Sequence, residues 1–141
     1  MTTLTLEAPA RSVEKLKTIA YWGATGLTAL AFLTGGIADL TRGPALVTGM
    51  AHLGYPAYFL LILGAWKVLG ALAIVAPRFP RLKEWAYAGM LFDLTGAALS
   101  HAASGDAPVK VLVPLVILGI TLASWSLRPT TSGRVLAPAA R

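Results

Sequence analysis

Four apolar stretches separated by short polar segments make up most of this 141-residue chain. They cover about residues 18–40, 56–76, 84–103 and 108–127. Each is close to the roughly 20 residues that a helix needs to cross a hydrocarbon core about 30 Å thick. Glycine and proline occur within them, which membrane helices tolerate when neighbouring helices pack against them. The pattern predicts an all-α protein, a four-helix transmembrane bundle.

The composition agrees with a membrane protein. Residues of the hydrophobic class make up 56% of the chain, charged residues only 13%, and the mean hydropathy is +0.69. Soluble domains usually carry about 25% charged residues. There is too little polar material to cover a water-soluble surface, so we expect a multi-pass membrane protein.

Basic residues are concentrated on one side of the predicted bundle. Arg42 and Lys110 lie on the other side, and Lys67 lies within a stretch. The remaining nine are Arg11, Lys15, Lys17, Arg78, Arg81, Lys83, Arg128, Arg134 and Arg141. The positive-inside rule then predicts an N-in/C-in topology. The net charge of +6 follows from this topology and favours anionic lipid. Because the basic residues are divided among short segments, no nucleic acid is expected as a partner.

The charge pattern also divides the chain. Residues 1–17 are predicted to be a cytoplasmic tail, residues 18–128 the membrane domain, and residues 129–141 a disordered cytoplasmic tail rich in proline, serine and threonine. The loop at residues 41–55 is long enough to carry a short turn of helix and to fold over the mouth of the bundle.

Lys67 and Asp93 stand in the middle of adjacent apolar stretches, each thirteen residues from Pro80 in the turn between them. In two antiparallel helices this spacing places both charges at the same depth, so we predict a buried ion pair. Ionisable groups at mid-membrane normally have a partner and often mark a function, such as a proton relay or a headgroup site. A purely structural pair is favoured, because one pair without further intramembrane acids makes a poor proton wire.

A second polar group is predicted at the outer side of the bundle. Its candidates for ligand binding are Asp39, His52, Tyr55, Ser100 and His101. A carboxylate, two imidazoles and hydroxyl groups could hydrogen-bond the carbonyl oxygens of a quinone or another amphipathic molecule. The alternative is that these side chains cap helix ends at the water interface, with Asp39 pairing with Arg42.

Several kinds of chemistry are disfavoured. The chain has no cysteine, which excludes thiolate catalysis and Cys-ligated metals. No spacing motif supports haem ligation by His52 and His101, or a zinc site that adds Asp39 or Asp106. No nucleophile with an adjacent base is visible, so we predict no catalytic residue, no metal site and, on balance, no enzyme.

Three runs resemble the DoxX-like family of small four-span bacterial membrane proteins. They are LGYPAYFLLILGAWKVLGA (residues 53–71), PRFPRLKEWAYAGMLFDLTGAALSHAASGD (77–106) and SWSLRP (124–129). The resemblance covers about residues 21–129 and implies a four-helix bundle in the bacterial inner membrane. The family name comes from a subunit linked to quinone-reducing oxidoreductases, while other distant relatives look like assembly chaperones.

Two functions are therefore kept open. The first is a binding module that holds a quinone-like or lipid-like molecule in a polar-lined pocket, as an accessory to membrane redox chemistry. The alternative is a non-enzymatic assembly or chaperone-like protein that docks a larger membrane partner. The expected partners are the lipid bilayer, a lipophilic small molecule, and a membrane protein or a second copy of the chain. Quinone is the candidate cofactor, and its identity stays open.

Overall fold

The structure is a computed structural model that describes residues 7–129. This part of the chain is all-α, as predicted, and contains no strand. Its five helices are α1 (Glu7–Thr41), α2 (Pro44–His52), α3 (Phe59–Val75), α4 (Pro80–Ala103) and α5 (Pro108–Ser126). Proline at the first helical position begins α2, α4 and α5, where its missing N–H costs nothing.

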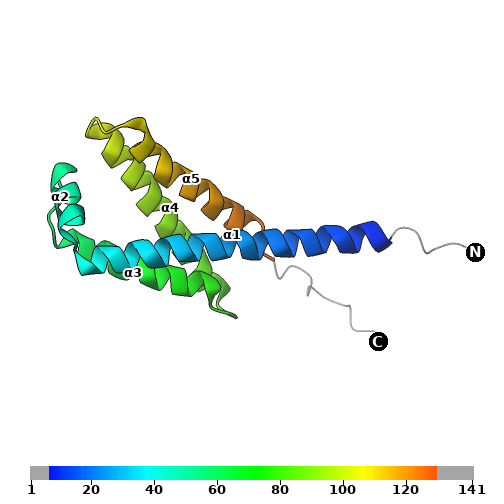
Figure 1. Cartoon of the computed structure of the whole chain (residues 1–141). Helices are drawn as coiled ribbons and strands as arrows, with labels where there is room; N and C mark the ends of the chain where they lie inside the picture. The colour runs from blue at the N-terminus through cyan, green and yellow to red at the C-terminus, as the bar shows by residue number, and fades with distance from the viewer. Residues whose placement is uncertain (1–6, 130–141) are drawn as a thin grey trace, which may run out of the picture.

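The four long helices form a closed arrangement in which each contacts two others. α1 packs against α3 and α5, and α4 packs against α5 and α3. Figure 1 shows α1 and α3 side by side, α4 and α5 side by side, and the short α2 at the far end of α1 from Glu7. We call this the α2 end, and the opposite end, with the α3–α4 turn and the last turn of α5, the basic end.

The helix limits follow the apolar stretches with three differences, one of which is that α4 begins at Pro80 instead of residue 84. The first helix begins at Glu7, so residues 7–17 of the predicted tail are helical. The third helix is shorter than its stretch, with 17 residues. The predicted short helix in the loop at residues 41–55 is present as α2. The predicted disordered tail at 129–141 lies outside the described residues except for Pro129.

Two of the described helices are long and apolar enough to cross a membrane: Ser12–Thr41 within α1, and α5. α3 is apolar but shorter. Large apolar side chains also lie on the exterior, for example Trp85, which is 80% exposed, and Phe92, which is 73% exposed. An apolar exterior of this kind is typical of helices that face lipid or a protein partner. The four-span arrangement and the orientation of the termini stay predictions.

The core lies where α1, α3 and α4 meet. Its buried side chains are Phe32, Ala71, Ile74, Tyr87, Met90 and Leu94. Towards the basic end, the hydroxyl of Ser124 lies 2.7 Å from both the Thr25 and the Tyr87 hydroxyl oxygens. All three residues are buried, so these hydrogen bonds join α1, α4 and α5 without water.

Glycine sets the closest approach of α1 and α3. A Cβ atom added to Gly64 would lie 2.8 Å from the carbonyl oxygen of Gly36, and one added to Gly36 would lie 2.9 Å from the carbonyl oxygen of Gly64. No larger residue fits between these backbones. Asp39 follows Gly36 by one helical turn, and Lys67 follows Gly64 by one turn. The glycine contact therefore brings the two charged side chains close together.

Candidate functional site

Lys67 is the centre of a charged cluster at the middle of the bundle. Its Nζ atom donates a hydrogen bond to Asp39 Oδ2 over 2.8 Å and lies 3.9 Å from Asp93 Oδ2. Only part of each side chain is exposed, 23% for Lys67, 9% for Asp39 and 18% for Asp93. We call these three residues the Lys67 triad. It contains one cation and two carboxylates drawn from α1, α3 and α4.

The structure adds a third residue, Asp39, to the Lys67–Asp93 pair predicted from the sequence. Asp93 does lie within ion-pair distance of Lys67, but the nearer carboxylate belongs to Asp39. The sequence analysis placed Asp39 in the outer polar group as a ligand-binding candidate, with an ion pair to Arg42 as the alternative. Its carboxylate instead contacts Lys67, and Arg42 donates only its backbone N–H to the Asp39 carbonyl, over 3.1 Å.

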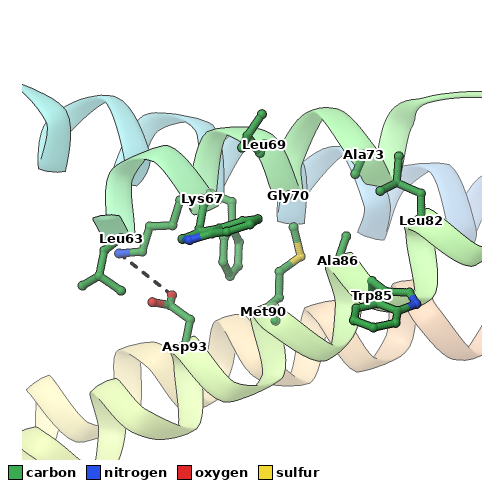
Figure 2. Close-up of a pocket in the computed structure, with 13 residues that line it drawn as sticks. Leu63, Lys67, Leu69, Gly70, Ala73, Leu82, Trp85, Ala86, Met90 and Asp93 are labelled. Carbon is green, nitrogen blue, oxygen red and sulfur yellow. Dashed lines mark ion pairs between the residues drawn. The ribbon is translucent and has the colours of Figure 1, made fainter. Parts of the chain in front are cut away.

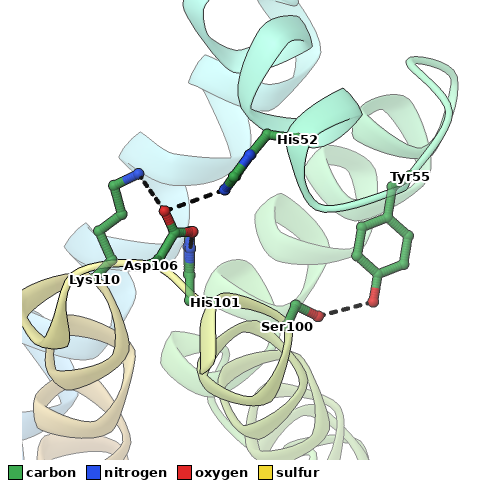
Figure 3. A network of polar contacts seen from close by, with 6 residues as sticks. All are labelled: His52, Tyr55, Ser100, His101, Asp106 and Lys110. Carbon is green, nitrogen blue, oxygen red and sulfur yellow. Dashed lines mark hydrogen bonds and ion pairs between the residues drawn. The ribbon is translucent and has the colours of Figure 1, made fainter. Parts of the chain in front are cut away.

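A second polar cluster lies at the α2 end, around Asp106 (Figure 3). His101 Nδ1 lies 2.7 Å from Asp106 Oδ2, while Lys110 Nζ lies 2.8 Å and His52 Nε2 lies 3.2 Å from Oδ1. An ionised carboxylate only accepts hydrogen bonds, so both imidazoles donate to it. We call these four residues the Asp106 cluster. It links the end of α2 to the α4–α5 turn.

The local backbone explains why Asp106 stands at the centre. Gly105 has φ +69°, in the left-handed region that favours glycine, and this conformation closes the short turn between α4 and α5. The hydrogen bond from His101, followed by that from Lys110, holds the pKa of the Asp106 carboxyl well below its ordinary value. The carboxylate is therefore ionised at any physiological pH. The sequence did not predict this central position of Asp106.

A third contact closes the same end of the molecule. The hydroxyl of Tyr55 lies 2.9 Å from the hydroxyl of Ser100 on α4. The Tyr55 ring also stacks on Phe59, with ring centroids 5.2 Å apart. The segment that carries α2 is thus attached at two points, through His52 to the α4–α5 turn and through Tyr55 to α4.

Beneath this segment lies a cavity of about 360 Å³, which we call the outer cavity. All five residues proposed from the sequence as ligand-binding candidates line it: Asp39, His52, Tyr55, Ser100 and His101. Lys67 and Asp93 line it as well, among apolar side chains that include Leu53, Leu60 and Phe92. Its size and its lining, mostly apolar with a few convergent polar groups, are those of small-molecule sites.

A second cavity of about 420 Å³, the inner cavity, lies between α3 and α4 (Figure 2). Its wall is apolar apart from Lys67 and Asp93, and Trp66, Trp85 and Met90 are among the residues that line it. Leu63, Lys67 and Asp93 line both cavities. The Lys67–Asp93 contact therefore stands at the boundary between a polar-lined and an apolar space.

The Lys67 ammonium group at this boundary can donate a hydrogen bond to an acceptor. The Lys67 ammonium has three protons and two neighbouring carboxylates, so one proton is available to a third acceptor. Within residues 7–129 no group of three or more His, Cys, Asp or Glu side chains is placed to hold a metal ion. The arrangement can bind and orient a carbonyl or hydroxyl group.

Comparison with known proteins identifies the family. The model of the DoxX-like family matches residues 23–124. The chain is also 36% identical over 74 residues to "Uncharacterized protein YdgD" of Bacillus subtilis (strain 168). That match covers 52% of this chain and 64% of the relative, which is less than two thirds of its length. No solved structure matches the chain significantly. The family match spans most of the chain and all of α3 and α4, and the chain belongs to the DoxX-like family.

Proposed function

We propose that this protein holds an amphipathic small molecule, quinone-like or lipid-like, with its polar head in the outer cavity. The observation that supports this most directly is the convergence of Asp39, Tyr55, Ser100 and His101 on one cavity, from separate segments of the chain. Lys67, at the inner limit of that cavity, supplies a hydrogen-bond donor to the head.

The inner cavity supports the amphipathic character of the ligand. It adjoins the outer cavity at Lys67 and Asp93 and is otherwise apolar. A ligand with a carbonyl or hydroxyl head and an apolar tail fits both spaces, the head towards α2 and the tail between α3 and α4. The 3.9 Å contact between Lys67 and Asp93 is the longer of the two triad contacts. It is therefore the contact that a bound ligand would replace.

The setting of this function is a membrane. Family membership and two helices apolar enough to cross a bilayer support a small membrane protein. Within that setting we propose four spans in the bacterial inner membrane, with both termini in the cytoplasm, as the distribution of basic residues favours. The α2 end and the outer cavity then face the periplasmic side. An accessory role in membrane redox chemistry is the extension that the family resemblance suggests.

Ligand binding is tested with matched hydroxyl deletions. Tyr55→Phe removes a hydroxyl that lines the outer cavity, whereas Tyr58→Phe removes one from a residue that is 62% exposed and lines no cavity described above. Purified protein in detergent is titrated with a short-chain ubiquinone, and binding is followed by quenching of the tryptophans that line the inner cavity. We expect Tyr55→Phe to weaken binding about fivefold to tenfold, the loss of roughly one hydrogen bond, and Tyr58→Phe to leave it unchanged.

A lipid-like head is distinguished from a quinone in the same titration. If a phospholipid or fatty alcohol saturates the protein and the quinone does not, the ligand is a lipid instead of a quinone, and the outer cavity remains the proposed site. If neither class binds, or if both tyrosine variants bind as well as the unaltered protein, the outer cavity is not a ligand site.

The alternative is an interaction protein, and one observation favours it. Gly23 and Gly26 on α1 and Gly119 on α5 are exposed, and a Cβ atom added to any of them would meet no neighbour within 4 Å. Exposed glycines let a second transmembrane helix approach closely. Replacing Gly26 with isoleucine should then dissociate a larger complex, measured by crosslinking in membranes, while leaving ubiquinone binding intact.

A further inference from the structure

A third cavity, of about 410 Å³, lies at the basic end, and we call it the basic cavity. It shares no lining residue with the outer or the inner cavity. Tyr21 and Trp22 of α1 form one side, Arg78 and Lys83 of the α3–α4 turn and α4 form another, and Arg128 closes it after α5. The ligand proposed above for the outer cavity does not account for this space.

The charge of the basic cavity is only partly compensated. Arg78, Lys83 and Arg128 line it, and no carboxylate among residues 7–129 lies within ion-pair distance of Arg78 or Lys83. Glu84 pairs with Arg128 alone. Three cations thus face one small space with a single carboxylate at its edge. An anion is the complementary ligand.

Arg128 supplies the second observation. Its Nη2 atom donates to Glu84 Oε1, and the other carboxylate oxygen of Glu84 accepts from Trp125 Nε1 over 2.9 Å. Glu84 is therefore engaged on both oxygens. The Nη1 atom of Arg128 is buried and has no hydrogen-bond partner among the described residues. Buried donors are nearly always satisfied, so an acceptor from outside this part of the chain is expected beside Nη1.

The surroundings indicate where the anion comes from. Trp22 is 54% exposed and its ring makes an edge contact with Tyr21, with centroids 5.2 Å apart. Phe79, which is 59% exposed, lines the same cavity. Indole and phenol rings beside cations at helix ends are typical of the lipid headgroup level in a bilayer. A free phosphate ion would gain nothing from these exposed apolar rings, whereas the glycerol and acyl chains of a lipid would contact them.

We infer that the basic cavity binds the phosphate of an anionic phospholipid, in the leaflet at this end of the bundle. Arg128 Nη1 donates to a phosphate oxygen, and Arg78 and Lys83 supply the charge that selects an anionic lipid over a zwitterionic one. This site is independent of the outer cavity, and each of the two can fail without the other.

The test uses two arginines that differ mainly in position. Arg78 and Arg42 both have positive φ, +69° and +48°, and lie at opposite ends of the molecule. Glycine is relaxed at both positions, so Arg78→Gly and Arg42→Gly each remove one charge without backbone strain. Only Arg78 lines the basic cavity. Delipidated protein in a neutral detergent is titrated with phosphatidylglycerol or phosphatidylcholine of identical chains and examined by native mass spectrometry.

We expect the unaltered protein and Arg42→Gly to bind one phosphatidylglycerol at least tenfold more tightly than phosphatidylcholine. One lost cation near a membrane surface is worth about 1 kcal/mol, so Arg78→Gly should weaken phosphatidylglycerol binding about fivefold. Adding Lys83→Gln should weaken it about fivefold more. The melting temperature with phosphatidylglycerol should rise less for Arg78→Gly than for Arg42→Gly.

Three results would overturn the inference. Equal binding of the two lipids would show that charge does not select the headgroup. Equal losses in Arg78→Gly and Arg42→Gly would show a diffuse charge effect instead of a site. Displacement of phosphatidylglycerol by millimolar inorganic phosphate, with the same sensitivity to Arg78→Gly, would assign the cavity to a free anion instead of a lipid.

Discussion

The two carboxylates of the Lys67 triad should contribute unequally to stability. At an effective dielectric constant of about 20, the attraction of two unit charges is about 6 kcal/mol at 2.8 Å and about 4 kcal/mol at 3.9 Å, before desolvation. Asp39 also accepts a charge-assisted hydrogen bond, worth about 1.5–3 kcal/mol net. We expect Asp39→Asn to lower the free energy of unfolding by about 2–3 kcal/mol, and Asp93→Asn by about 1 kcal/mol.

Double substitutions test directly whether Asp39 or Asp93 contributes more to stability. Lys67→Met alone leaves two facing carboxylates without a cation and should cost about 3–5 kcal/mol, as for other broken buried pairs. Adding Asp39→Leu should restore most of that loss, because the remaining Asp93 is more exposed and lines both cavities. Adding Asp93→Leu should restore much less, because Asp39, only 9% exposed, then stays unpaired.

The assay is unfolding in a neutral detergent, followed by circular dichroism as the fraction of sodium dodecyl sulfate increases. Thr95→Ala is a suitable control, because the Thr95 hydroxyl bonds only to carbonyl groups of its own helix. If Asp93→Asn costs as much as Asp39→Asn, or if Lys67→Met with Asp93→Leu is the better-restored pair, the assignment of Asp39 as the dominant partner is wrong.

Three further outcomes follow from topology, charge and packing. Reporter fusions after Arg42 should report an external position and fusions after Pro80 an internal one; an external signal after Pro80 would refute the proposed orientation. Because the folded-state pKa of Asp106 is lowered, its stabilising contribution is fully present above the unfolded pKa of about 4 and is lost as the pH falls from there through the lower folded-state pKa. The melting temperature of Asp106→Asn should therefore depend less on pH between 6 and 3 than that of the unaltered protein; parallel curves would contradict this. Gly64→Ala should destabilise the protein by about 1–3 kcal/mol or more, since its Cβ would lie 2.8 Å from backbone, whereas Gly35→Ala, with nothing within 4 Å, should be neutral or slightly stabilising in the same unfolding assay.

The helices could be predicted because they depend on local pattern, and the same pattern places Lys67 and Asp93 on adjacent helices. Apolar stretches of helical length set the helices, and the short turn at residues 76–79 limits the register of α3 against α4. Lys67 lies eight residues before the end of α3 and Asp93 thirteen residues after the start of α4, so counting from the turn places them on facing parts of the two helices but not at one level. No knowledge of the remaining chain is needed for that inference.

Asp39 could not be placed in the same way. The connection from α1 to α3 contains the whole of α2, so counting residues from a turn gives no register. A signal was nevertheless present, because Gly36 and Gly64 each precede a charged residue by three positions. Two close-packed glycines one turn before two opposite charges indicate a helix contact that brings those charges together. The central place of Asp106 depends on three side chains from separate segments, and no local pattern encodes that arrangement.

If the proposed ligand binds at the triad, the unequal contacts of Lys67 assign stability and binding to different carboxylates. The short contact to Asp39 adds to the glycine contact between α1 and α3 and holds Lys67 in place. The long contact to Asp93 crosses to α4, which α3 meets along the inner cavity. The proposed ligand would replace Asp93 as an acceptor from Lys67 and leave the Asp39 bond in place. If Lys67 contacted only one carboxylate, a ligand that reached the ammonium group would have to break the contact that holds the helices together.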